Sequence, residues 1–446
     1  MEYLLLLVAT NVWAFLIPNL DGLSLATGII ASLIGAHNIR TFFKLHKTYK
    51  ISFDQSPLSL LLLMHLVYYS LSVIGVYSRL PAYDYNISKE SLCIGTLSVG
   101  LIIHLMLQIF SFIYRRDLMP KFNWNVANIL LLQIIVLIVA VSLTVLAYQK
   151  GYYGYEFFEN FSTYIVEDYW GVVMYMMMTS IMYVLSAISG LACAQTRGFS
   201  KCIAIACTMG IIGIAYFTAA GGRMGYFYEM ILFIIFYFSG KKSQISVLKL
   251  FILSSLIAIP ILSQMILYYS GRADSLDVSG VVYEMDSRPN LSSFGAYLFS
   301  KSIGADFSVL KEAFIGVIPS ALFPGKAGML QGAYDNYLIR SDLDPKVDYP
   351  DTLFSTGVMI FGQIGFILFP LFYVFVFSWF CRFMKNIKNG GLCFNFMLSM
   401  FAITGFIELY PDGLFLYART ACILFCLLSG LLFIGIFNVK KLIKLK

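Results

Sequence analysis

The chain has 446 residues, of which 59% are hydrophobic and only 12% are charged, and its formal net charge is +7. Because a soluble domain carries about 25% charged residues, this composition excludes an ordinary soluble protein and indicates an integral membrane protein. The first apolar run is longer than the hydrophobic region of a signal peptide, and no small-residue cleavage site stands out near it, so we expect a retained span.

Apolar runs of about 20 residues, the length that crosses a bilayer, recur along the whole chain. They are predicted near 3–20, 22–38, 57–77, 92–114, 125–147, 170–195, 202–221, 226–240, 246–268, 353–380, 393–409 and 413–437. Only a Gly-Gly-Arg turn separates the seventh run from the eighth. The sequence therefore predicts an all-α integral membrane protein with about 12 transmembrane helices, which forms a single domain over 1–446.

Basic residues cluster after every second predicted span. The clusters are Arg40/Lys44/Lys47/Lys50, Arg115/Arg116/Lys121, Arg197/Lys201, Lys241/Lys242/Lys249, Arg382/Lys385/Lys388 and Lys440/Lys441/Lys444/Lys446. Because short loops rich in Lys and Arg stay in the cytoplasm, this side and both termini are predicted to be cytoplasmic. The net positive charge thus reflects membrane orientation, and no basic and aromatic tract suggests binding to nucleic acid.

One connection on the opposite, outer side is far longer than the others and covers 269–352. Within it, the stretch Ser300–Lys326 has apolar residues at spacings of three or four, namely Ile303, Phe307, Leu310, Phe314 and Val317. This spacing predicts an amphipathic helix, which we expect to lie at the membrane face. Pro319, Pro324 and Gly325 would end that helix.

Of the 31 basic residues, 12 fall on the outer side, against the usual bias, and six of them form the set of interest: Arg223, Arg272, Arg288, Lys326, Arg340 and Arg419. Each one alone fits a cation that extends toward lipid phosphates. Arg223, Arg272 and Arg419 lie at the ends of three separate spans, however, and together they favour a built anion site. Because arginine binds phosphate through a bidentate fork, the expected ligand is a lipid-linked phosphate or pyrophosphate.

Four stretches of the second half carry a resemblance to a known family. They are "GGRMG" at the start of the eighth span, "EMDSRPNLSSFG" (Glu284–Gly295), "IPSALFPGKAGM" followed by "PDTLFSTGVMIFGQIGF" (Pro350–Phe366), and "ELYPDGLFLYAR" before the last span. In order and spacing they resemble the Wzy-type polysaccharide polymerases of O-antigen and enterobacterial common antigen, over roughly 215–430. The arginine followed eleven residues later by glycine, which some members carry, is not found at Arg223, Arg272, Arg288 or Arg340.

The resemblance implies a glycosyltransferase at the periplasmic face of the bacterial inner membrane. The donor would be a glycan on undecaprenyl pyrophosphate, and the acceptor a hydroxyl of a lipid-linked repeat unit. Arginines would stabilise the departing pyrophosphate without a cofactor, and no carboxylate or histidine cluster has metal spacing. The residues predicted to bind the pyrophosphate are Arg223, Arg288 and Arg419, with Arg272 and Lys326 as weaker candidates. The implied partners are the lipid-linked oligosaccharide, membrane lipids and a candidate chain-length regulator protein.

The acceptor hydroxyl needs a general base, and outer carboxylates near the arginines are the candidates: Asp286, Asp335, Asp351, Glu408 and Asp412. Glu408 ranks first because it ends an apolar span, where desolvation favours proton uptake. Asp351 ranks second because it begins the tenth span after Pro350, although an aspartate there also fits a helix cap. Glu229 would pair with a cation, whereas His65 and His104, inside spans, are expected to make helix contacts or to serve as the base.

Three other functions stay open. A flippase for lipid-linked oligosaccharide usually lacks a long outer loop and places its cations in a cavity within the spans, whereas the spans here are almost free of charge. An O-antigen ligase would share the fold and the donor but would use the lipid A core as acceptor. A polyprenyl-phosphate-sugar glycosyltransferase usually has acidic residues in its first outer loop, where this chain has only Asp21, a predicted turn residue.

Overall fold

The computed structural model describes most of the predicted spans of the first half and the second part of the long outer loop. The described residues are 20–49, 57–78, 87–115, 129–151, 169–218, 291–317, 323–345 and 351–384, with residues 4, 7, 8, 11, 14, 347 and 349 and part of 229–237. Within them the regular elements are all helices, which confirms the all-α class.

Five stretches of the described residues are long and apolar enough to cross a membrane. They are Gly22–Thr48, Leu58–Tyr77, Lys89–Ile113, Ile129–Lys150 and Leu353–Trp379, and shorter apolar helical segments occur at Ser180–Gln195 and Phe199–Gly210. These coincide with seven of the predicted spans and support a membrane-embedded protein. The predicted spans near 3–20, 226–240, 246–268, 393–409 and 413–437 lie wholly or largely outside the described residues, so the count of twelve stays a prediction.

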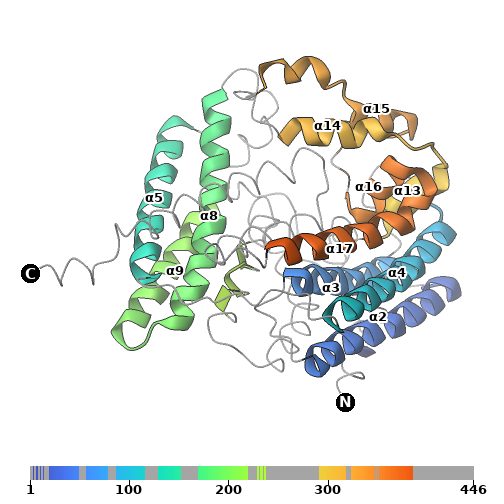
Figure 1. Ribbon diagram of the computed structural model, residues 1–446, viewed down its shortest axis with the longest axis horizontal. Coiled ribbons are helices and arrows are strands. Elements are labelled where there is room, and N and C mark those ends of the chain that lie inside the picture. The colour runs from blue at the N-terminus through green and yellow to red at the C-terminus, as the bar shows by residue number, and fades with distance from the viewer. Residues whose placement is uncertain are drawn as a thin grey trace, which may run out of the picture. The chain divides into compact units, whose positions relative to one another are not determined.

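The described helices pack as two groups (Figure 1). The first group has spans α2 (Gly22–Thr48), α3 (Pro57–Ser78), α4 (Lys89–Arg115) and α17 (Gly365–Met384), with the shorter α13 (Ser293–Lys301), α14 (Phe307–Val317), η3 (Pro324–Met329), α15 (Ala333–Arg340), α16 (Leu353–Phe361) and η4 (Gly362–Ile364). The second group has α5 (Ile129–Lys150), α8 (Tyr169–Gln195) and α9 (Phe199–Thr218). Each group is described by itself below.

In the first group, α2, α3 and α4 pack side by side through small and polar residues, as Figure 1 shows in blue and teal. The Asn38 side chain of α2 donates to the carbonyl of Gly100 in α4 at 2.9 Å. A Cβ atom on Gly100 would come within 2.3 Å of the Tyr69 hydroxyl of α3. Small residues at helix contacts are typical of membrane proteins, because they let backbones approach closely.

The two ends of this three-helix set differ in charge. At one end, hereafter the Asp21 end, Asp21 caps α2 by accepting from the Ser24 amide at 2.8 Å and forms an ion pair with Lys89 of α4. At the other end, hereafter the basic end, α2 continues through the basic cluster that was predicted to follow it, and α4 ends at Arg115. The basic residues thus gather at one end, and the orientation in which the Asp21 end faces outward stays a prediction.

The residues that follow 290 form a layer of short helices, hereafter the loop layer (α13, α14, η3 and α15), which is seated on the Asp21 end. The Leu291 amide donates to Ser72 Oγ of α3 at 2.8 Å, and Ser292 Oγ lies 2.8 Å from Thr96 Oγ1 of α4. A Cβ atom on Gly95 would lie only 2.5 Å from Ala296 Cβ. The long outer loop is thus packed against the span ends over this part of its length.

The predicted amphipathic helix is shorter than expected. Ser302 adopts a left-handed conformation with φ 55° and ends α13, and α14 begins only at Phe307. Within α14, Phe307 and Phe314 are each 60% exposed, whereas Val309 is buried. The apolar spacing therefore reflects a helix that turns two phenylalanines outward rather than into the protein.

The tenth predicted span, near 353–380, is not one continuous helix. Gly362, with φ 68°, ends α16 after nine residues, and the chain turns back through η4 into α17. Leu353 packs against Phe369 and Tyr373, which shows that α16 folds back over the start of α17. At 1.5 Å per residue, α16 is about 14 Å long, roughly half of the hydrocarbon core, whereas α17 with its 20 residues can cross it.

The second group is held by a buried polar side chain at the contact of three spans. Gln133 of α5 donates to Ser189 Oγ of α8 at 2.9 Å and to the Ala204 carbonyl of α9 at 3.0 Å. Gly190 of α8 also lies against the backbone of the helical segment within 229–237, because a Cβ atom there would meet the Phe233 carbonyl at 2.3 Å. The hydrogen bonds of Gln133 thus join α5, α8 and α9, and Gly190 lets the segment within 229–237 pack closely on α8.

The fold-back of α16 on α17 requires two glycines and can be tested directly. A Cβ atom on Gly357 would lie 2.3 Å from the Gly365 carbonyl oxygen, so Gly357→Ala should destabilise the protein by about 1–3 kcal/mol through overpacking. Thermal unfolding of the purified protein in detergent measures this loss. Gly304→Ala is the control, because nothing lies within 4 Å of a Cβ atom there. Equal melting temperatures for the two variants would contradict the tight contact.

Candidate functional site

Most of the predicted site residues lie outside the described part of the chain. These are Arg223, Arg272, Arg288, Arg419 and Glu408, and the alternative bases Asp286 and Asp412. Whether the arginines converge on one anion site therefore stays a prediction. Of the remaining three, Lys326 lies in η3 of the loop layer, Asp335 lies in the first turn of α15, and Asp351 lies directly before α16.

Asp351 is a buried carboxylate, with only 2% of its surface exposed. Its Oδ2 atom accepts a hydrogen bond from the Tyr334 hydroxyl at 2.5 Å, and its Oδ1 atom lies 3.3 Å from the donor Ser355 Oγ. The contact with Tyr334 lies in the range of short hydrogen bonds between a hydroxyl and a carboxylate. Both oxygens of the carboxylate are thus engaged by hydroxyl groups that come from two different helices.

The start of α16 fixes the position of Asp351. Thr352, not Asp351, is the N-cap residue, because its hydroxyl accepts from the Phe354 and Ser355 amides while Ser355 Oγ accepts from the Thr352 amide at 2.7 Å. This reciprocal pair is a capping box. The alternative in which Asp351 itself caps the helix is therefore wrong, and its carboxylate contacts the hydroxyl groups of Tyr334 and Ser355.

Neighbouring helices hold α16 rigidly around this carboxylate. Gly295 of α13 lies so close to α16 that a Cβ atom there would come within 3.0 Å of Phe354 Cβ and 3.2 Å of the Ser355 amide. The Asp306 amide, at the start of α14, donates to the Met359 carbonyl at 2.9 Å. The loop layer thus braces α16 at both of its ends.

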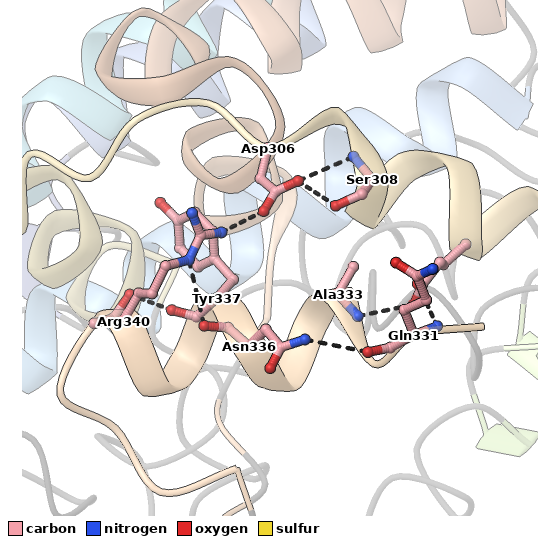
Figure 2. Close-up of polar contacts among 9 residues, drawn as sticks. Asp306, Ser308, Gln331, Ala333, Asn336, Tyr337 and Arg340 are labelled. Carbon is pink, nitrogen blue, oxygen red and sulfur yellow. Dashed lines mark hydrogen bonds and ion pairs between the residues drawn. The ribbon is translucent and has the colours of Figure 1, made fainter. Parts of the chain in front are cut away.

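Tyr334 reaches Asp351 from the first turn of α15, and a carboxylate on α14 holds that turn. Glu312 accepts hydrogen bonds from the backbone amides of Gln331 at 2.6 Å and Ala333 at 2.8 Å. Gly332 between them has φ 67°, a conformation that favours glycine. Figure 2 shows Gln331 and Ala333 on this turn. Tyr334 itself is half-buried, unlike the buried Asp351.

One of the six outer cations of interest, Arg340, is engaged within the loop layer. Its guanidinium forms an ion pair with Asp306, which directly precedes α14, and lies 5.3 Å from the centre of the Tyr337 ring, as Figure 2 shows. Burial favours a higher pKa for Asp306, but hydrogen bonds from Ser308 and Arg340 outweigh it and hold the pKa below the ordinary value. Arg340 therefore connects α14 to α15 and is not among the candidates for substrate binding.

The other polar candidates take structural places. His104 Nδ1 of α4 lies 3.0 Å from Asn38 Oδ1 of α2, which agrees with the predicted helix contact. His65 is buried, and its Nδ1 lies 2.8 Å from the Leu61 carbonyl of the same helix. Glu229 is 7% exposed, and its expected pairing with a cation stays a prediction. Asp335 is exposed in the first turn of α15.

Two residues of the Asp351 site were missed by sequence reasoning. Ser355 lies four residues after Asp351, a spacing that brings side chains together at a helix start and could have been noticed. Tyr334 lies 17 residues earlier, beyond a turn and a connecting segment, and no local pattern connects it to Asp351. The structure therefore adds Tyr334 and Ser355 to the candidate site.

Comparison of the chain with protein-family models, with curated proteins and with solved structures finds no match. The resemblance to the Wzy-type polymerases accordingly rests on its four short motifs. One of these, "PDTLFSTG", contains Asp351 and Ser355 together with the capping residue Thr352. The motif therefore has a definite local structure, the start of α16 and its buried carboxylate.

The depressed pKa of Asp306 predicts a pH-dependent stability. Because the folded pKa lies below the unfolded one, the contacts of Asp306 stabilise the fold above the unfolded pKa, and the stabilisation is lost as pH falls below about 4. Asp306→Asn should lower the melting temperature at pH 7 by the equivalent of about 0–1 kcal/mol, since Arg340 is half exposed. Thermal unfolding should show a smaller difference in melting temperature between Asp306→Asn and wild type below pH 4 than at pH 7. A difference that is larger in acid would contradict a folded pKa below the unfolded one.

Proposed function

We propose that this protein is a polysaccharide polymerase of the bacterial inner membrane, which joins lipid-linked oligosaccharide repeat units at the periplasmic face. The observation that carries the proposal is the buried Asp351 carboxylate, held by two hydroxyl groups at the start of α16. It lies within a motif that resembles those polymerases, and beside a layer seated on the Asp21 end. A carboxylate fixed at the start of α16 is suited to remove a proton from a sugar hydroxyl.

The position of the loop layer supports a site at the outer surface. Leu291, Ser292 and Ala296 contact α3 and α4 at the Asp21 end, the end opposite to the basic cluster of α2 and Arg115. By the bias of Lys and Arg toward the cytoplasm, the layer and Asp351 face the periplasm and both termini face the cytoplasm. The exposed Phe307 and Phe314 of α14 suit contact with the outer leaflet, where a lipid-linked substrate resides.

The chemistry we propose is glycosyl transfer with undecaprenyl pyrophosphate as the leaving group. The acceptor hydroxyl of one repeat unit attacks the anomeric carbon of the donor glycan, its proton passes to Asp351, and the bond to pyrophosphate breaks. Arg223, Arg288 and Arg419, with Arg272 and Lys326 as weaker candidates, would stabilise the charge on the pyrophosphate. Glu408 is the alternative base.

The function predicts a specific phenotype for deletion of the gene in its own bacterium. If the surface glycan is an O-antigen, the deletion strain should still attach one repeat unit to lipid A core but should lack the ladder of longer chains on a gel. A flippase or ligase deletion should attach no repeat unit. Loss of every repeat unit would therefore exclude the polymerase and favour one of these alternatives.

The anion site predicts that Arg223 is required for the donor. Arg223→Ala should abolish long glycan while the protein level stays intact, and Arg223→Lys should restore little, because lysine lacks the bidentate fork. The measurement is polymerisation by the purified variants with lipid-linked repeat unit in detergent. Arg340→Ala is the matched control, since Arg340 is already paired with Asp306, and it should remain active. Full activity of Arg223→Ala would remove Arg223 from the site.

A further inference from the structure

Asp351 is placed to hold a proton but not to meet a substrate. Only 2% of its surface is exposed, and each carboxylate oxygen already contacts a hydroxyl group. Of these two residues, Ser355 is fully buried, whereas Tyr334 is half-buried. A sugar hydroxyl that approaches the site can therefore come close to Tyr334 more readily than to Asp351.

We propose that Tyr334 is the catalytic residue that contacts the acceptor hydroxyl and passes its proton inward to Asp351, an inference that rests on the proposed function. A phenol suits this role because its oxygen can donate one hydrogen bond and accept another at the same time. The hydrogen bond to Asp351 Oδ2, at 2.5 Å, lies in the range of short bonds between a hydroxyl and a carboxylate. Proton transfer along such a bond requires little movement of heavy atoms.

The step is balanced without any further reactant. As the acceptor oxygen forms its bond to the anomeric carbon, its proton moves to the Tyr334 oxygen, and the phenolic proton of Tyr334 moves to Asp351 Oδ2. The bond between the anomeric carbon and the pyrophosphate oxygen breaks, and its electron pair leaves with undecaprenyl pyrophosphate. Tyr334 ends the step as a neutral phenol, and Asp351 ends it as a protonated carboxyl group.

Two other features of the site suit this assignment. Ser355 contacts the second carboxylate oxygen and so directs Oδ2 toward Tyr334. Glu312 binds the Gln331 and Ala333 amides and thereby fixes the backbone immediately before Tyr334. Tyr334 and Asp351 are therefore held at the starts of α15 and α16. Proton transfer between them requires such fixed positions.

The chain offers a matched control three residues further along the same helix. Tyr337 is fully buried, and among the described residues its hydroxyl has no hydrogen-bond partner. Burial raises the pKa of Tyr337 to about 12, so this phenol stays neutral at working pH. Tyr337→Phe removes the same atom as Tyr334→Phe, and it should leave turnover unchanged while the fold is kept.

The test is turnover of the purified full-length protein with lipid-linked repeat unit in detergent. Tyr334→Phe should lower turnover roughly 10²–10⁴-fold, the range of general base catalysis, with the donor KM and the melting temperature close to wild type. Asp351→Asn should be similarly inactive and Tyr337→Phe active. Wild-type turnover by Tyr334→Phe with an inactive Asp351→Asn would overturn the relay and leave the polymerase intact, whereas absence of polymerisation by the wild type would overturn the proposed function itself.

A second measurement separates a relay from a merely supporting hydrogen bond. Difluorotyrosine introduced at position 334 alone keeps the shape and the hydrogen bond but makes the phenol more acidic. If Tyr334 relays the proton, turnover and its pH optimum in the difluorotyrosine variant should differ from those of the wild type. The decrease in wild-type turnover in deuterated water should then fit the transfer of two protons. An unchanged pH profile, or a solvent effect from one proton, would show that Tyr334 only holds Asp351 in place.

Discussion

The arrangement of the candidate site depends on how the loop layer is seated on the ends of the spans. Backbone groups near the membrane boundary must find partners within the protein, and here the Leu291 amide finds Ser72 while Ser292 contacts Thr96. Gly95 makes the approach possible, because a side chain there would meet Ala296. From this contact α13 braces α16, and α16 carries Asp351. A polar anchor on α3 and α4 thus determines where a carboxylate in the second half of the chain lies.

The sequence predicted those parts of the fold that depend on hydropathy and charge alone. Spans such as Gly22–Thr48 and Lys89–Ile113 are apolar over a bilayer's length, and the charge difference between the two ends of α2–α4 follows the clusters read from the sequence. The break within 353–380 was not predicted, since its cause is a single glycine with positive φ inside an apolar run. Hydropathy cannot distinguish a helix that continues from one that folds back when both are equally apolar.

The candidate site was predicted unevenly for a similar reason. Asp351 could be found because an outer carboxylate beside a proline at a span start is locally unusual, whereas Tyr334 looks like any tyrosine of the loop. Its role follows only from the turn that Glu312 fixes and from the burial of Asp351. The helix cap was weighed as an alternative role for Asp351, whereas Thr352 makes it, because both residue types suit a cap and the sequence does not show which one binds the free amides.

The loop layer also shows why a cation on the outer side need not belong to an anion site. Arg340 was counted with the outer arginines, yet it faces Asp306, so the pair carries no net charge that would attract pyrophosphate. Asp351 is the contrasting case, since its described contacts are hydrogen bonds from the hydroxyl groups of Tyr334 and Ser355. A site for glycosyl transfer needs cations for the leaving group and a carboxylate that can take up a proton. Ion pairing therefore places Arg340 in the framework of the loop layer, whereas its hydrogen bond with Tyr334 places Asp351 beside a group that can carry a proton.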